Sequence, residues 1–159
     1  MIRPATKDDF LIILEIYETA RTFMRKNGNP TQWSNNHPAP ELLQSDIEIG
    51  DLYVVDYDGK IYGVFAMLFG VDLPYNYIEG SWMDDSEYVA VHRVASSGER
   101  KGILTDIMTF VKEKSNHIKI DTHEDNIPMQ KALFKNSFSK RGIIFLENGD
   151  PRIAFEWLK

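Results

Sequence analysis

Residues 88–111 read YVAVHRVASSGERKGILTDIMTFV, and this stretch combines three local patterns. Tyr88–Ala95 is rich in β-branched and aromatic residues, which favour a buried strand. From Ile103 to Val111 the apolar residues recur at helical spacing. The polar residues Ser96–Gly102 lie between them, so we predict a strand, a short loop and a helix.

The polar loop has the composition of an anion-binding site. Gly98 and Gly102 allow the backbone to turn with positive φ and to approach a ligand closely. A helix that begins near Gly102 presents unpaired N–H groups and the positive end of its dipole, a combination that binds phosphate. The same residues also suit an ordinary solvent-exposed turn. The loop contains neither G-x-x-x-x-G-K-[ST] nor G-x-G-x-x-G, which excludes a Walker loop and a dinucleotide fingerprint.

The second half of the chain continues this pattern and connects it to a known family. Ile118–Asp121 is a short strand pattern, and a helical run that starts near Asn126 ends at Phe138. In these residues, and in the order of its elements, the chain resembles the GNAT superfamily of N-acetyltransferases. In that family a strand leads into a pyrophosphate loop, [QR]-x-x-G-x-[GA], and a helix. A further strand and an Asn-led helix ending in Gly-Phe follow.

The chain departs from the family pattern at four positions. Ser97 stands where the family usually has Gln or Arg, and Arg100 stands in place of its first glycine. Phe134 replaces the common tyrosine, and Ser137 replaces the glycine before Phe138. The pyrophosphate loop is therefore degenerate, and the tyrosine hydroxyl is missing.

Length and composition narrow the class of protein. At 159 residues with 43% hydrophobic residues, we expect one domain over residues 1–159, with a core that needs no metal or disulfide. The absence of Cys excludes a thiolate site and suits a cytoplasmic protein. The net charge of -6 argues against non-specific nucleic-acid binding. No apolar run is long enough to span a membrane, and none resembles a signal peptide.

The remaining periodicities predict an α/β fold. We expect a GNAT-like mixed, mostly antiparallel, twisted sheet of about six or seven strands, flanked on both faces by about four helices. The strands at Tyr88 and Ile118 should be parallel, because a helix joins them. The other expected elements are helices at 6–25 and 40–49, and strands at 2–5, 52–56, 61–69, 139–145 and 152–157.

Two segments can line an acceptor pocket, and each has a plainer interpretation. Trp33 either plugs the core under the second helix or lines the pocket, because GNAT clefts are built in part from the connection between the first two helices. Val71–Glu87, which contains Tyr77, is aromatic for a connector. It is either a loop tucked against the sheet or one wall of the acceptor site.

The family resemblance implies acetyl-CoA as co-substrate. It places the pyrophosphate on the N–H groups of Gly98–Ile103. It places the pantetheine arm on the backbone of Val94 and Ser96. Arg100 and Lys101 either add charge to the phosphates or simply solvate the loop. The implied cofactor-binding residues are Val94, Ser96, Gly98, Arg100, Lys101, Gly102, Ile103 and Asn126.

His92 is the candidate general base. It precedes the loop on the strand expected to carry the thioester, and an imidazole titrates near neutrality, as removal of a proton from an ammonium requires. A strand histidine is also often a packed, hydrogen-bonded residue. Glu87 and Asp121 are the reserve candidates. Because Phe134 has no hydroxyl, the leaving thiolate needs another proton donor or leaves unassisted.

These residues lead to one preferred function and an alternative. We expect an N-acetyltransferase that moves an acetyl group to a small-molecule or peptide amine by direct attack in a ternary complex. The alternative is an acyl-CoA-binding sensor or interaction module with little or no activity. Asp121, His123, Glu124 and Asp125 lie close in sequence, but we expect no metal, because a strand end and a loop rarely bring such residues together. A homodimer is compatible with the sequence, and nucleic acid and membrane are not expected partners.

Overall fold

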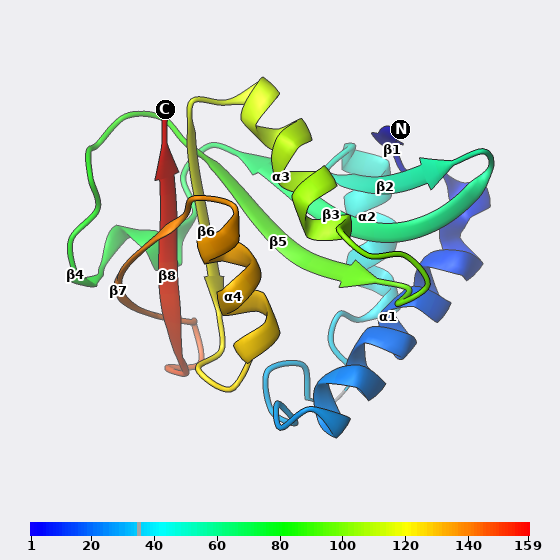
Figure 1. Cartoon of the computed structure of the whole chain (residues 1–159), viewed down its shortest axis with the longest axis horizontal. Coiled ribbons are helices and arrows are strands. Elements are labelled where there is room, and N and C mark those ends of the chain that lie inside the picture. Colours follow the sequence, from blue (N-terminus) through cyan, green and yellow to red (C-terminus); the bar gives the residue numbers. More distant parts are fainter. Residues whose placement is uncertain (35) are drawn as a thin grey trace.

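The computed structural model of the protein describes residues 1–34 and 36–159. Within these residues the strands form one eight-stranded sheet (Figure 1). The strand order is β1-β2-β3-β5-β6-β8-β7-β4. Among the described strands, only β5 and β6 pair in parallel, which confirms the mixed, mostly antiparallel sheet. The strands are β1 (Ile2–Pro4), β2 (Leu52–Tyr57), β3 (Lys60–Phe69), β4 (Glu79–Gly80), β5 (Val89–Ser96), β6 (His117–Thr122), β7 (Ser139–Phe145) and β8 (Pro151–Leu158).

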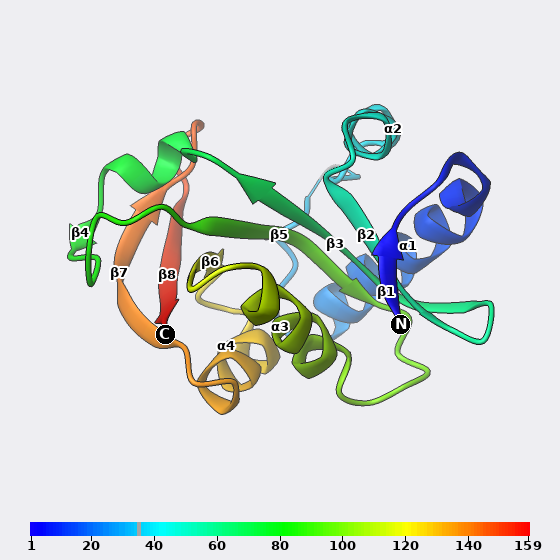
Figure 2. The same cartoon turned by 90° about the horizontal axis from the view of Figure 1, so that it is seen from above.

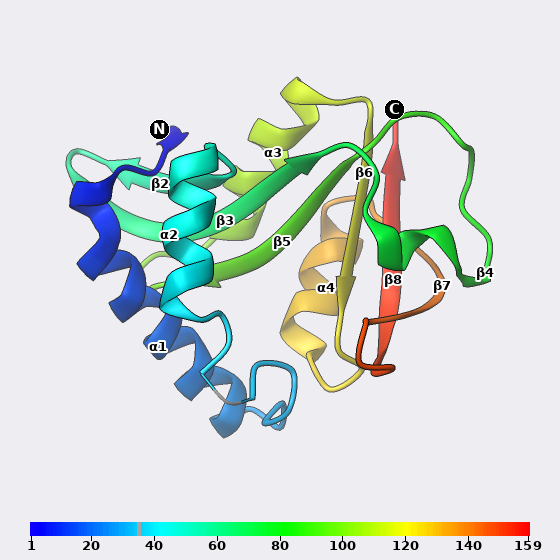
Figure 3. The same ribbon diagram turned by 180° about the vertical axis from the view of Figure 1, so that it is seen from behind.

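Within residues 1–34 and 36–159, four α-helices cover both faces of the sheet, as the sequence predicts (Figure 2, Figure 3). They are α1 (Phe10–Lys26), α2 (Pro40–Ile49), α3 (Ile103–Lys114) and α4 (Ile127–Lys135). α1 and α2 pack over one buried cluster, and α3 and α4 pack over another on the opposite face. Among the described residues, no helix is long and apolar enough to cross a membrane.

The eighth strand lies in a segment for which no strand was predicted. β4 is only two residues long and pairs with β7 at the edge of the sheet. Glycines face each other there: a Cβ on Gly80 would lie 2.2 Å from the Arg141 carbonyl oxygen, and one on Gly142 would lie 2.1 Å from the Glu79 carbonyl oxygen. So short a pair has no alternation in sequence, which is why the pattern did not reveal it.

A β-bulge shapes β5 at its centre. Opposite β5, Val64 pairs with Ala95 and Ala66 pairs with His92, so Phe65 alone faces two residues. The extra residue is Arg93, whose φ of 53° is unusual for a residue with a side chain.

Contacts from both helices of the first face hold Arg93. The Tyr17 hydroxyl of α1 donates a hydrogen bond of 2.7 Å to the Arg93 carbonyl. The Arg93 guanidinium forms an ion pair with Asp46 of α2, with Nε and Nη2 each 2.9 Å from Oδ2. Burial raises the pKa of Asp46, and the charge and hydrogen bond of Arg93 oppose that rise.

The start of α3 is held against β3 by a close contact at a glycine. A Cβ added to Gly63 would lie only 2.6 Å from Cγ2 of Ile103, the first residue of α3. Ile103 is almost completely buried, so neither side can move freely. Gly63 therefore determines how close the start of α3 comes to the sheet.

We predict that Gly63→Ala destabilises the fold by about 1 to 3 kcal/mol, the usual cost of overpacking a core. In an Ile103→Ala background the same substitution should cost much less, because the clashing methyl group is gone. Denaturant unfolding of the four proteins measures this coupling. Additive effects would show that the contact does not constrain α3.

We also predict that Arg93→Ala destabilises the fold by about 3 to 5 kcal/mol, because it leaves the buried Asp46 carboxylate without a cation. Without that cation the pKa of Asp46 rises further in the folded state. The deficit should therefore be small below the unfolded-state pKa of about 3.9, and it should grow as the pH rises through the folded-state pKa.

The matched control is Arg25→Ala, which removes a solvent-exposed pair with Glu18 and should cost less than about 1 kcal/mol. Unfolding free energies measured across an acid-to-neutral pH series test both statements. A deficit for Arg93→Ala that does not change with pH would contradict the electrostatic explanation.

Candidate active site

A cleft opens where the two parallel strands separate. β5 and β6 pair only at Val89 with Ile118 and at Ala90 with Lys119, and beyond these pairs the strands diverge (Figure 1). The rest of β5 runs on with β3, while β6 continues along β8. The sheet thus presents two unpaired strand edges to one space, between the loop before α3 on one side and α4 on the other.

A cavity of about 500 Å³ lies on this cleft. Its lining comes from elements that are distant in the sequence: the α1–α2 connection, β5, β6, the start of α4, and the β7–β8 hairpin. The lining residues are Met24, Thr31, Gln32, Trp33, Ser34, His37, Pro74, Val91, His92, Arg93, Val94, Ile120, Asp121, Asn126, Met129, Leu146, Glu147, Asn148, Asp150 and Arg152.

His92 lies in this lining and is fixed by a carboxylate. Its Nε2 is hydrogen-bonded to Oδ2 of Asp72, a residue just after β3. The His92 ring also lies 5.9 Å from the ring of Tyr75, whose hydroxyl donates to Asp121 at 2.7 Å. Burial is the main reason that the pKa of Tyr75 lies well above its usual value, and the Asp121 carboxylate raises it further. The reserve candidate Asp121 also lines the cavity, whereas Glu87 does not.

Trp33 packs against the core and also borders the cavity, so its contact with an acceptor stays a prediction. Its ring packs 5.6 Å from the buried Tyr17, against the core of the first face, and it also lines the cavity. Tyr77 differs: it is 64% exposed, it lies 6.3 Å from Phe145, and it is not part of the lining. Its predicted contact with an acceptor has no support from this geometry.

Gln32 joins the α1–α2 connection to the far side of the cleft. Its side-chain oxygen accepts hydrogen bonds from Asn29 at 2.8 Å and from Asn126 at 2.9 Å. Asn126 is in turn the N-cap of α4, since its Oδ1 accepts from the Met129 N–H. Asn126 therefore positions a wall of the cavity, a structural role beyond the cofactor contact that the sequence suggests.

The loop before α3 has the predicted geometry. Gly98 and Gly102 both adopt positive φ, of 79° and 80°, and α3 begins directly after Gly102. The N–H of Gly98 is capped by the Ser96 hydroxyl at 3.1 Å. Within the described part of the chain, the backbone N–H groups of residues 100–105 have no hydrogen-bond acceptor. Such a row at a helix start is suited to a phosphate.

Two basic side chains accompany this row of N–H groups. The Arg100 guanidinium stacks on the Tyr57 ring at 3.8 Å, and Lys101 is exposed at the tip of the loop. The remaining strand candidates, Val94 and Ser96, lie on the part of β5 that faces the open cleft, and Val94 also lines the cavity. The contacts of these four residues with the cofactor stay predictions.

Phe134 and Ser137 lie where the family pattern differs. Phe134 is half exposed on α4, its ring edge-on to Phe155 at 5.3 Å, and it is not part of the cavity lining. Ser137 has a φ of 69°, a conformation that usually favours glycine. The backbone turn that ends α4 is therefore retained although its glycine is not.

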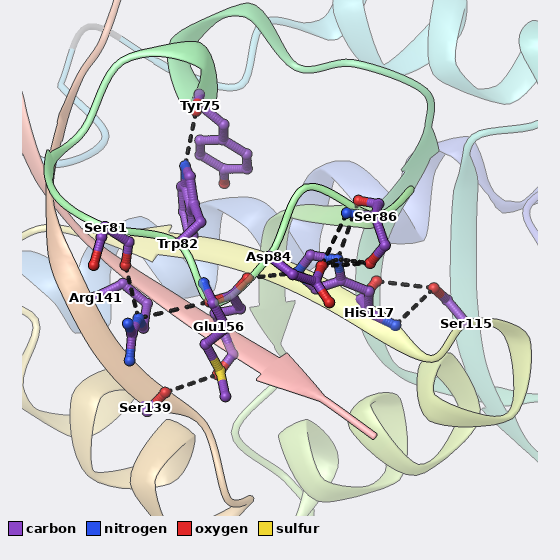
Figure 4. Close-up of polar contacts among 11 residues, drawn as sticks. Tyr75, Ser81, Trp82, Asp84, Ser86, Ser115, His117, Ser139, Arg141 and Glu156 are labelled. Atoms are coloured by element: carbon purple, nitrogen blue, oxygen red, sulfur yellow. Dashed lines mark hydrogen bonds and ion pairs between the residues drawn. The ribbon is translucent and has the colours of Figure 1, made fainter.

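The segment between β3 and β5 is tied down on the sheet by polar contacts (Figure 4). The Met83 N–H donates to the buried Glu156 at 2.8 Å, and Arg141 donates to the Ser81 carbonyl at 2.9 Å. Glu156 also binds the His117 ring at 2.5 Å. Of the segment, only Pro74 lines the cavity, although Asp72 and Tyr75 reach His92. The segment between β3 and β5 therefore contacts His92 from outside the cavity and contributes little to the cavity lining.

Sequence reasoning did not find Asp72, Tyr75, Gln32 and Arg152. Asp72 and Tyr75 reach the site through His92, and Gln32 lines the cavity within a loop that carries no functional pattern. Arg152 alone carried a signal, as a charged residue at the start of a largely apolar strand.

Comparisons with known proteins agree with this geometry. No protein-family model and no curated protein matches the chain. Among solved structures, a GNAT-family acetyltransferase from Streptococcus agalactiae is 28% identical with a TM-score of 0.92, covering 100% of this chain and 95% of that one. A putative acetyltransferase from Staphylococcus aureus is 24% identical with a TM-score of 0.71, covering 99% and 98%.

A more distant structure shows the same fold with ligands. An aminoglycoside acetyltransferase in complex with coenzyme A and kanamycin is 15% identical with a TM-score of 0.66, covering 100% of this chain and 94% of that one. At that identity the likeness concerns the fold. Together with the match to the Streptococcus protein over its full length, the strand order and the cleft show that this chain has the fold of the GNAT-family acetyltransferases.

Proposed function

We propose that this chain is a single acetyl-CoA-binding domain that transfers the acetyl group to the amine of an acceptor held in the 500 Å³ cavity. The observation that carries the proposal is the divergence of β5 from β6 beside a row of free N–H groups. A long donor with a pyrophosphate at one end and a thioester at the other fits such a cleft, and the cavity adjoins its inner end.

Different residues of the chain would bind different parts of the donor, acetyl-CoA. The N–H groups at 100–105 and the α3 dipole would hold the pyrophosphate, with Lys101 and Arg100 adding positive charge. Val94 and Ser96, on the open edge of β5, would bind the amide groups of the pantetheine arm. This arrangement places the thioester near His92, which lies on the same strand and lines the cavity.

The transfer itself needs a neutral amine beside the thioester. In our proposal His92 takes a proton from the acceptor ammonium, and Asp72 holds the imidazole in place through Nε2. The amine nitrogen then attacks the thioester carbonyl carbon, the carbon–sulfur bond breaks, and coenzyme A leaves as the thiolate. The nitrogen gives its second proton to water, which leaves the neutral amide. Phe134 supplies no proton to that thiolate, so protonation comes from another group or from water.

A binding-only protein is the second candidate, and Phe134 favours it. The side chain is apolar and lies outside the cavity lining, so it cannot assist the leaving group. Such a protein would bind acetyl-CoA without turnover. Calorimetry with acetyl-CoA, followed by release of free thiol in the presence of an amine panel, separates the two functions.

We predict that acetyl-CoA raises the melting temperature of the parent, because a ligand that binds only the folded state stabilises it. Gly102→Val should abolish most of this shift, since a branched side chain at the loop blocks the approach of the phosphates. Gly50→Val is the matched control: both glycines have positive φ and open space around the Cβ position, but Gly50 ends α2. Equal shifts in the two variants would show that the loop does not bind the donor.

We predict that His92→Ala lowers the maximal rate by about 100-fold or more while the affinity for acetyl-CoA stays near that of the parent. His123→Ala, outside the cavity lining, serves as the control. A loss of less than about threefold, together with a lower melting temperature, would identify His92 as a packing residue.

A further inference from the structure

Arg152 is a buried cation without an anionic partner. It lies in β8 with only 6% of its surface exposed. Its Nη1 donates to the carbonyl of its neighbour Pro151 at 2.8 Å, and its Nη2 donates to the Gln32 carbonyl at 3.4 Å. Among the described residues, its Nε has no acceptor, and no carboxylate lies within ion-pair distance of the guanidinium.

The other arginines that are shielded from solvent differ in this respect. Arg3 forms ion pairs with Asp9 and Asp56, and Arg93 forms one with Asp46. A buried charge is costly unless an opposite charge compensates it. Arg152 therefore stands apart as a largely buried guanidinium whose charge has no carboxylate partner in the described part of the chain.

Arg152 lines the same cavity that His92 lines. The carboxylates of the lining are already engaged or lie at its exposed edge. Asp121 accepts the Tyr75 hydroxyl, while Glu147 and Asp150 are exposed residues of the β7–β8 hairpin. The uncompensated positive charge thus belongs to the buried part of the cavity.

The pKa of a neighbouring histidine reflects the same positive charge. His37 lines the cavity, and its pKa is lowered, first by burial and then by the positive charges of Arg93, Arg21 and Arg152. Amide groups complete the surroundings, since Gln32, Asn126 and Asn148 line the same cavity. Amide N–H donors and a guanidinium are the groups that bind a carboxylate or a phosphate.

From this arrangement we infer that the acceptor is an amine that also carries an acidic group, a carboxylate or a phosphate, and that Arg152 binds this group. The inference rests on the proposed acetyl transfer and names its substrate class. The acidic group would supply the charge that Arg152 lacks, while the amine of the same molecule faces His92. The guanidinium offers its free Nε–H and the outer N–H donors, a fork that matches two oxygen atoms of one acid.

Calorimetric titration of the complex with coenzyme A tests this inference without requiring turnover. The probes are pairs that differ only in the acidic group: L-lysine against cadaverine, L-ornithine against putrescine, and phosphoethanolamine against ethanolamine. We expect at least one acid-bearing member to bind about tenfold or more tightly than its partner, the scale of one charge-assisted hydrogen bond. The first two pairs report a carboxylate site, and the third reports a phosphate site.

Arg152→Met should remove this preference and leave the affinity for coenzyme A unchanged. The matched control is Arg141→Met, because Arg141 lies on the adjacent strand, donates to the Ser81 carbonyl and is not part of the lining. The control should keep the preference. If Arg152→Met does not fold, Arg152→Gln removes the charge while it keeps a donor for the Gln32 carbonyl, and the same loss is expected.

The inference is overturned if neither member of any pair binds, if both members of every pair bind equally, or if the preference survives the loss of Arg152. Failure of the proposed function gives a different result. A preference for acid-bearing amines that depends on Arg152, without any release of thiol from acetyl-CoA, would refute acetyl transfer and leave the anion site in place. Transfer to amines that is indifferent to their acidic group would refute the anion site alone.

Discussion

The buried ion pair between Arg93 and Asp46 is the contact on which the cleft depends. Arg93 is the extra residue of the bulge in β5, and its left-handed backbone conformation has to be held by its surroundings. Asp46 binds the side chain and Tyr17 binds the carbonyl, so α1 and α2 together fix the bulge. Without these contacts nothing in the local sequence would keep this strand bent.

The bent strand explains why the sheet opens where it does. A bulge increases the local twist of a strand and turns it away from its neighbour. β5 and β6 accordingly share only two residue pairs, and their remaining edges are free for a ligand. The same opening brings together the N–H groups before α3, the imidazole of His92 and the cavity, all of which come from different layers of the molecule. The bulge in β5 therefore accounts for both the opening of the sheet and the position of the site.

The cavity is distinguished by the charge of a residue that lines it. The structurally similar aminoglycoside acetyltransferase is known in complex with kanamycin. In the present chain a buried arginine lies in the cavity, and its charge has no carboxylate partner among the described residues. Hydrophobic burial and strand order can be shared by proteins with different functions, because function depends on a few side chains at the site.

Local patterns in the sequence were enough to predict most elements, the parallel pair of strands and the turn geometry of the loop before α3. Periodicity and the two glycines of the loop act over a few residues, so their physical consequences can be read from neighbours in the chain. His92 could be singled out as a candidate because it precedes the loop on the strand expected to carry the thioester.

The tertiary structure alone decided which residues face one another across the cleft. Gln32 meets Arg152 across 120 positions of sequence, and Asp72 meets His92 across a strand and a connection. Tyr77 looked suitable as an aromatic residue in a connector, yet its segment turns it toward Phe145. Burial and partnership are properties of the packed molecule, because they depend on which distant segments exclude water from the same side chain. No local pattern contains that information, and for this reason the uncompensated charge of Arg152 became visible only in the fold.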